Sequence, residues 1–150
     1  MMWVRIDNRL IHGQVIETWI PYVEAKWILV MNDELAKDSF QQEIMCLAVP
    51  DTIKIYFLSV YNPLAYPKDV NLEQTLVLLA NCNDAKTVFD QGFTFDVLNI
   101  GNLHYAPGKE QICDHIALSK EDIDCLHYFE YKGVNLDFRC VPNSYVQVSI

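Results

Sequence analysis

The sequence predicts an α/β protein, because short apolar segments alternate with segments of helical periodicity along the chain. With 150 residues, 51% of them hydrophobic, the chain is long enough to bury a core without a disulfide or a metal. Its sequence contains no repeat or linker, so we expect a single domain over residues 1–150. The expected strands lie near residues 3–6, 27–31, 53–58, 75–80, 95–100, 111–118 and 134–141.

The last of these segments differs from the first five. The first five are short apolar runs, which are typical of strands buried on both faces of a parallel sheet. In the last segment apolar residues alternate with Asn135, Asp137 and Arg139, so one face of that strand is expected to meet solvent. We therefore expect a mostly parallel sheet of about seven strands, with an antiparallel strand at its edge.

Helices are expected between the strands. The first begins at about Gln14, because apolar residues then recur with helical spacing, at Val15, Ile16, Trp19, Ile20 and Val23. A second is expected over residues 34–48. Between residues 61 and 69, two prolines predict a loop or a broken helical turn.

Two further helices are predicted from residues that favour helix ends. Asn83 is expected to cap a helix that ends near Gly92. Ser119 and Asp122 are spaced as in a capping box, and Gly133 suits the left-handed residue after the last turn.

Charge and composition exclude several classes of protein. The net charge is −9, from 20 acidic and 11 basic residues, and no dense basic cluster is present, so a nucleic-acid surface is not expected. The longest apolar runs, such as residues 27–31 and 76–80, are far shorter than the roughly 18 residues of a membrane helix. The first residues lack the pattern of a secretory signal, which favours a cytoplasmic protein.

Cofactor and metal sites are not expected. The five cysteines have no C-x-x-C spacing, so reduced thiols are favoured over the alternative of a zinc or redox site. No P-loop or dinucleotide-binding glycine motif occurs, and no nucleophile elbow of a hydrolase. A response-regulator receiver needs an aspartate at the end of its third strand, and residues 55–59 end without one.

The first strand-to-helix connection is the best candidate for a functional site, since ligands of open α/β sheets bind at the carboxyl ends of the strands. His12 lies there, beside Gly13 and just before the first helix. Two of the three arginines of the chain, Arg5 and Arg9, are close by in the sequence.

These residues predict a phosphate site. A neutral imidazole at His12 is a competent nucleophile, and the free amides of a helix start at Gly13 and Gln14 would stabilise anionic oxygens. Arg9 would bind a phosphoryl group in transfer, with help from Arg5, while Asp7 is expected to orient a side chain rather than touch phosphate. The alternative is a histidine that only caps the turn or packs in the core. The residues alone leave both interpretations open.

Residues 5–15 read Arg-Ile-Asp-Asn-Arg-Leu-Ile-His-Gly-Gln-Val. This stretch resembles the phosphorylation-site motif of enzyme IIB of the mannose/fructose/sorbose family of the bacterial sugar phosphotransferase system. The similarity continues in the same order through residues 32–36, 99–101, 108–109, 119–124 and 139–142, and so covers nearly the whole chain.

The resemblance implies that His12 accepts a phosphoryl group from a IIA component and passes it to a sugar that enters through a IIC/IID permease. It also implies that Arg9 grips the phosphoryl group and that the backbone at Gly13 and Gln14 surrounds it. The implied fold is a three-layer α/β/α sandwich. Implied partners are IIA, the IIC/IID permease at the inner face of the membrane, a hexose-type sugar and a second copy of the chain.

The sequence departs from the family pattern at two places. Residues 101–104 read Gly-Asn-Leu-His where the family often has two glycines before Met-His, and residues 59–69 are rich in proline and aromatics. Ser59 is a candidate phosphate-contacting hydroxyl. His104 is expected on a surface loop, and His115 and His127 in packing or solvated positions. A regulatory phosphoacceptor that reports sugar supply without transport stays open as an alternative function.

Overall fold

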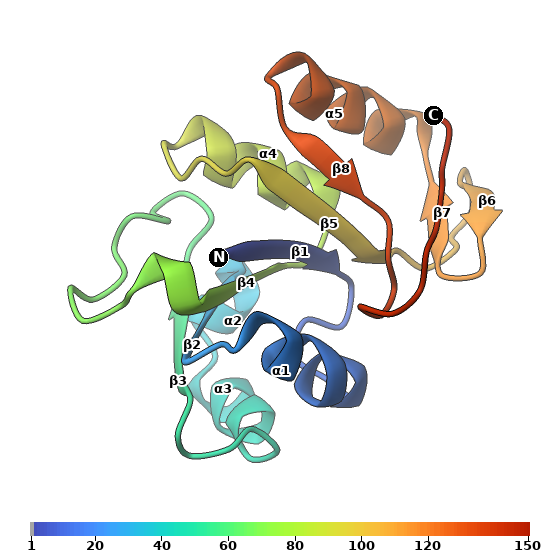
Figure 1. The fold of residues 1–150 in the computed structure, drawn as a ribbon. Coiled ribbons are helices and arrows are strands. Elements are labelled where there is room, and N and C mark those ends of the chain that lie inside the picture. The colour runs from blue at the N-terminus through green and yellow to red at the C-terminus, as the bar shows by residue number, and fades with distance from the viewer. Residues whose placement is uncertain (1) are drawn as a thin grey trace.

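Six parallel strands form the central sheet of the computed structural model, which describes residues 2–150 (Figure 1). The strands are β1 (Trp3–Asp7), β2 (Trp27–Met31), β3 (Lys54–Leu58), β4 (Thr75–Leu79), β5 (Val97–Asn102) and β8 (Asn135–Asp137), in the spatial order β3-β2-β4-β1-β5-β8. The central strands β1 and β4 are buried throughout, as their apolar sequences predict.

The antiparallel pairing lies outside this sheet. The strand expected over residues 111–118 is two strands, β6 (Glu110–Cys113) and β7 (Ile116–Leu118), joined by a turn and paired antiparallel with each other. The last strand, β8, does lie at the sheet edge, but it pairs parallel with β5. Its alternating pattern reports a half-exposed edge and carries no information on strand direction.

Helices connect the strands. A π-helical turn, η1 (Val15–Trp19), continues into α1 (Ile20–Val23). The others are α2 (Asp33–Ala36), α3 (Ser39–Cys46), the 3₁₀ turn η2 (Leu72–Gln74), α4 (Cys82–Asp90) and α5 (Lys120–Tyr131).

Local side-chain caps determine where several of these helices begin. The expected helix over residues 34–48 is interrupted, because Asp38 accepts a hydrogen bond from the Gln41 amide and starts α3. Asn81, and not Asn83, caps α4 by accepting from the Asp84 amide at 2.8 Å. The capping box of α5, between Ser119 and Asp122, is confirmed.

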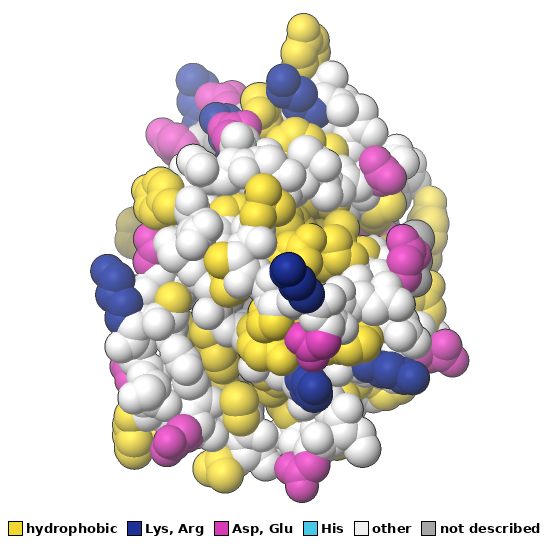
Figure 2. Space-filling model, turned by 90° about the vertical axis from the view of Figure 1, so that its left-hand side faces the viewer, with side chains coloured by type: hydrophobic (Ala, Val, Ile, Leu, Met, Phe, Trp, Pro, Cys, Tyr) yellow, Lys and Arg dark blue, Asp and Glu magenta, His cyan; other side chains and the backbone are white. Residues whose placement is uncertain are grey.

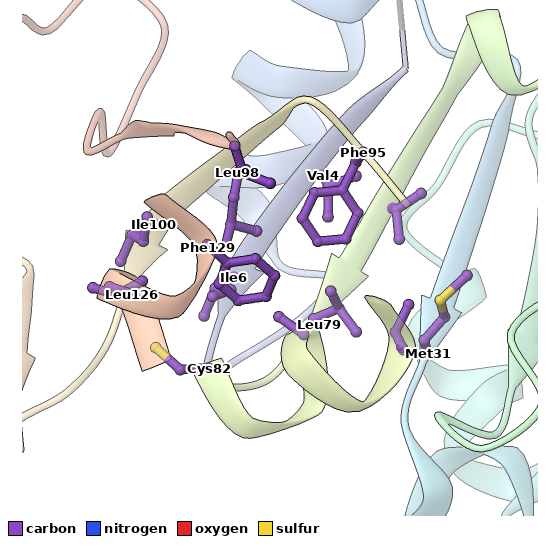
Figure 3. Packing of buried hydrophobic residues seen from close by; sticks show 14 of the residues in the cluster. Val4, Ile6, Met31, Leu79, Cys82, Phe95, Leu98, Ile100, Leu126 and Phe129 are labelled. Atoms are coloured by element: carbon purple, nitrogen blue, oxygen red, sulfur yellow. The ribbon is translucent and has the colours of Figure 1, made fainter. Parts of the chain in front are cut away.

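The helices cover both faces of the sheet and give three layers, as the fold class predicts (Figure 1). On one face, Ile6, Leu79 and Leu98 pack against α4 and α5 (Figure 3). On the other face, Trp19 and Ile28 belong to a second buried cluster under η1 and α1. The sheet therefore has a hydrophobic core on each face. Polar groups can lie at the ends of the strands, outside these two cores.

One face of the molecule carries dispersed charges. Figure 2 shows the side of the molecule at the left of Figure 1, where basic side chains lie among acidic and hydrophobic ones. Within residues 2–150, no helix has the length and apolar character needed to cross a membrane.

Candidate functional site

The loop after β1 crosses the carboxyl end of the sheet. The amide of Asn8 donates to the carbonyl of Asn102 at 3.0 Å, which ties the loop to β5. The amide of Leu10 donates to the carbonyl of Asp7 at 3.0 Å, and Leu10 has a φ of 58°, in the left-handed region that few non-glycine residues adopt. The following helical run starts at Gly13. This tight turn places His12 directly over the end of β1.

His12 contacts Asp7 through one ring nitrogen. Nε2 lies 2.8 Å from Asp7 Oδ2, and the side chain of His12 is 12% exposed while that of Asp7 is fully buried. Among residues 2–150, no group forms a hydrogen bond with Nδ1 of His12. Since the carboxylate stabilises the tautomer with the proton on Nε2, the lone pair of Nδ1 is the one left for chemistry.

Asp7 is surrounded by donors. Its Oδ2 accepts from Arg5 Nη2 at 3.0 Å and from Asn102 Nδ2 at 2.8 Å, and its Oδ1 accepts from the Arg9 amide at 3.0 Å. Burial raises the pKa of Asp7, but hydrogen bonds to His12 and Asn102 and the charge of Arg5 outweigh it and leave the pKa lowered. Asp7 is therefore a carboxylate at neutral pH.

Arg5 lies beneath the loop and does not reach the surface. Its guanidinium donates to Asn99 Oδ1 at 2.7 Å and to the carbonyl of Arg139 at 3.2 Å, and the residue is 0% exposed. Burial lowers the pKa of Arg5, and the charge of Asp7 offsets part of this effect. Arg5, expected at the phosphate, instead supports the carboxylate that holds His12.

The remaining predicted residues fall into two groups. The side chain of Arg9 is exposed and lines a cleft of about 540 Å³ that also touches the ends of β2 and β4. Gly13 is exposed, and Gln14 Oε1 accepts from Asn102 Nδ2 at 3.1 Å. Gly13 and Gln14 directly follow His12 in the chain. Ser59 lies apart from His12, because its hydroxyl donates to Asp33 Oδ1 at 2.7 Å and β3 is separated from β1 by two strands.

Within residues 2–150, the other three histidines form no hydrogen bond with Asp7 or His12. His104 is exposed, and its amide donates to Asn8 Oδ1. His115 Nε2 contacts the carbonyl of Phe138 at 2.9 Å, and His127 pairs with Glu130 on the exposed face of α5. Among the described residues, His12 alone of the four histidines contacts a buried carboxylate.

Several site residues are missed by sequence reasoning. Asn99 and Asn102 are buried polar residues inside the apolar strand β5, and that interruption is a signal that could have drawn attention to them. Residue 101 has no room for a side chain, because a Cβ there would lie 2.0 Å from Arg5 Cζ. Arg139 and Cys140 join the site from the far end of the chain; they lie in the family-like stretch 139–142, but no local pattern gives them a role.

The lowered pKa of Asp7 predicts a pH dependence of stability. A carboxyl group whose pKa falls below its ordinary 3.8 on folding stabilises the fold above that value, and this stabilisation is lost as the pH falls through the folded-state pKa. We expect the free energy of unfolding to fall below about pH 4, and Asp7→Asn to remove part of that fall. Urea unfolding at stepped pH measures it; an identical pH slope in the variant would contradict the assignment.

The site thus presents one imidazole nitrogen without a hydrogen-bond partner among the described residues, a buried carboxylate behind the ring, an exposed arginine and a helix start. Within residues 2–150, no three His, Cys, Asp or Glu side chains come together as a metal site requires. The arrangement suits a nucleophile that accepts an anionic group.

Residues 1–148 match the family model described as PTS system sorbose subfamily IIB component. The chain belongs to this family. It is similar to the sorbose-specific EIIB component of Klebsiella pneumoniae, with 32% identity over 93% of this chain and 86% of that protein. It is also 32% identical to the N-acetylgalactosamine-specific enzyme IIB component 2 of Escherichia coli K12, over 92% and 88% of the two chains.

Solved structures agree with the family and the fold. The crystal structure of the IIBSor domain of the sorbose permease from Klebsiella pneumoniae matches this IIB chain with a TM-score of 0.85 and 30% identity, over 99% of this chain and 93% of that one. An N-acetylgalactosamine IIB component from Streptococcus pyogenes matches with a TM-score of 0.87 at 27% identity, over 93% and 87%. EIIB components are sugar-specific parts of phosphotransferase systems, so this chain is one too.

Proposed function

We propose that this IIB chain is a phosphocarrier in which Nδ1 of His12 accepts a phosphoryl group from a phosphorylated IIA component and passes it to a hexose-type sugar at a IIC/IID permease. The observation that carries the proposal is the contact between Nε2 of His12 and the buried carboxylate of Asp7. It leaves Nδ1 as the free nucleophile and stabilises the positive charge that the ring gains when Nδ1 forms a bond.

Each transfer exchanges one bond for another. In the first, the lone pair of Nδ1 forms a bond to phosphorus while the bond to the IIA donor breaks and its electron pair returns to that donor. In the second, a sugar hydroxyl oxygen bonds to phosphorus, the bond to Nδ1 breaks and the hydroxyl proton is released. The chain is then an Nπ-phosphohistidine–sugar phosphotransferase, since Nδ1 is the π nitrogen of the ring.

Charge stabilisation in both transfers comes from groups around the ring. The first amides of a helix have no partner inside the helix, and those at Gly13 and Gln14 follow His12 directly. Arg9 is exposed and its guanidinium has no partner among residues 2–150, so it is free to bind phosphoryl oxygens.

The names of the relatives support the proposed IIA partner and the sugar substrate. The mannose-specific EIIAB component of Escherichia coli K12 is 27% identical over 91% of this chain, which spans 43% of that longer protein, and its name joins a IIA and a IIB part. The relatives are named for sorbose, N-acetylgalactosamine, fructose and mannose, which supports a hexose-type substrate. We place the chain in the cytoplasm, at the permease, and expect a homodimer, which light scattering measures.

Intact-mass measurement after incubation with a phosphorylated IIA of the same family tests the proposal. We expect one phosphate on the wild type, labile in acid and stable in alkali, and none on His12→Ala. His104→Ala is the matched control, since that side chain is exposed. A phosphate that persists in His12→Ala, or that His104→Ala removes, would overturn the assignment.

Arg9→Ala is expected to fold normally and to accept phosphate more slowly, by roughly 10²-fold, because one charged donor to the transferred group is lost. Quenched-flow labelling measures the rate. Lys120→Ala, which removes a side chain that is 88% exposed on α5, serves as the control for net charge. Equal rates in Arg9→Ala and the wild type would remove Arg9 from the mechanism.

A further inference from the structure

A segment near the C-terminus closes around a single guanidinium. Residues 137–142, which we name the clasp, begin at the last residue of β8. Nε of Arg139 donates to both carboxylate oxygens of Asp137, at 3.2 and 3.0 Å, and Nη1 donates to the carbonyl of Pro142 at 3.0 Å. One side chain therefore joins both ends of the clasp.

Aromatic rings enclose the same guanidinium. Cζ of Arg139 lies 5.4 Å from the ring centroid of Trp3 and 5.5 Å from those of Trp19 and Tyr22. A planar guanidinium stacks on rings while its Nε donates to a carboxylate and its Nη1 to a carbonyl, a geometry that the ammonium group of lysine does not reproduce. The side chain is 22% exposed, so solvent screens these contacts only in part. The environment is specific for arginine.

The clasp directs its backbone and its thiol at the site. The carbonyl of Arg139 accepts from Arg5 Nη1 at 3.2 Å, and the carbonyl of Cys140 accepts from Trp19 Nε1 at 2.9 Å. The thiol of Cys140 lies 3.4 Å from Gln14 Oε1 and acts as its donor. The clasp thus contacts Arg5 and Gln14, two residues that flank the loop that carries His12.

From Arg5 the contacts continue to the reacting ring. Nη2 and Nε of Arg5 donate to Asp7 Oδ2 at 3.0 and 3.3 Å, and the same oxygen lies 2.8 Å from Nε2 of His12. We propose that Arg139 is a positioning residue for phosphoryl transfer, which closes the clasp and so fixes Arg5, Asp7 and the ring of His12. This inference rests on the proposed function of His12.

The test compares Arg139→Ala, Arg139→Lys and the wild type in transfer from phosphorylated IIA. Because a misplacement of about 1 Å at a reacting group is costly, we expect kcat to fall roughly tenfold in Arg139→Ala with little change in KM. Arg139→Lys keeps the charge and an alkyl chain but loses the planar group that stacks on the rings and donates to Asp137 and Pro142 together, so we expect an intermediate rate. Lys132→Ala, a basic residue at the end of α5, is the control for charge.

A second readout separates positioning from general stability. In ¹⁵N-labelled protein, the ring nitrogens of His12 report the tautomer that Asp7 selects. We expect the proton to stay on Nε2 in the wild type and to be shared between the two nitrogens in Arg139→Ala. Circular dichroism and thermal unfolding test whether each variant is folded.

The outcomes are distinct. If the wild type accepts phosphate and Arg139→Ala shows the same kcat and the same His12 spectrum, the positioning role is wrong while the proposed function stands. A fall in kcat that follows only a loss of folded protein also contradicts it. If Arg139→Ala does not fold, Arg139→Lys decides by the same two measurements. If the wild type accepts no phosphate on His12, the proposed function itself fails.

Discussion

Asp7→Ala is expected to destabilise the protein by about 3–5 kcal/mol and to reduce phosphoryl acceptance to the level of the His12→Ala variant. The guanidinium of Arg5 is 0% exposed, and the substitution would leave it buried without its carboxylate partner. The donors at Asn102 and at the Arg9 amide would lose their acceptor as well. Urea unfolding and the phosphorylation assay measure the two effects.

Asp124→Ala is the matched control for this variant. Asp124 is an exposed carboxylate on α5 that pairs with Lys120 at 4.0 Å, and surface pairs of this kind contribute about 0–1 kcal/mol. We expect wild-type stability and wild-type phosphorylation. If Asp7→Ala were as stable as Asp124→Ala, the buried ion pair would not have the structural role assigned to it.

After Asp7→Ala, Gly101→Ala is expected to cause the second-largest loss of stability. The added methyl would lie 2.0 Å from Arg5 Cζ and 2.2 Å from Nη1. Arg5 is held by Asp7, Asn99 and the Arg139 carbonyl, so it has no space to move aside. We expect a loss of about 1–3 kcal/mol or more, with slower phosphoryl transfer. Thermal unfolding measures the first effect.

Gly13→Ala is the control for the change from glycine to alanine. No atom lies within 4 Å of a Cβ at Gly13, and its φ is not in the left-handed region, so no loss of stability is expected. If the clash with Arg5 is the cause, Arg5→Met should reduce the cost of Gly101→Ala in a double-mutant cycle. Additive effects of the two substitutions would rule that cause out.

Much of the fold could be predicted because it depends on local patterns. The apolar runs at residues 27–31 and 75–80 lie in the buried strands β2 and β4. The prediction failed where the pattern is ambiguous. Residues 111–118 are apolar enough for one strand, and the turn that divides them contains no glycine or proline.

The site could be predicted only in part, since half of it is local in sequence. His12, Asp7 and Arg9 lie within six residues of one another, and their residue types allow a phosphate site without excluding a histidine that only caps the turn or packs in the core. Arg5 was expected at the phosphate, although strand alternation places Arg5 and Asp7 on one face of β1, where they pair. Asn102 and Arg139 reach the site because β5 lies beside β1 and β8 beside β5, a strand order that composition does not reveal.

The position of the phosphate on the imidazole ring tests the central claim most directly. The protein would be labelled with ¹⁵N at histidine, phosphorylated by IIA and examined by correlation spectroscopy that couples ring nitrogens, ring protons and phosphorus. Because Asp7 holds Nε2 at 2.8 Å, we predict a single phosphohistidine at residue 12 with phosphorus on Nδ1. Phosphorus on Nε2 of His12, or on any other residue, would contradict this assignment.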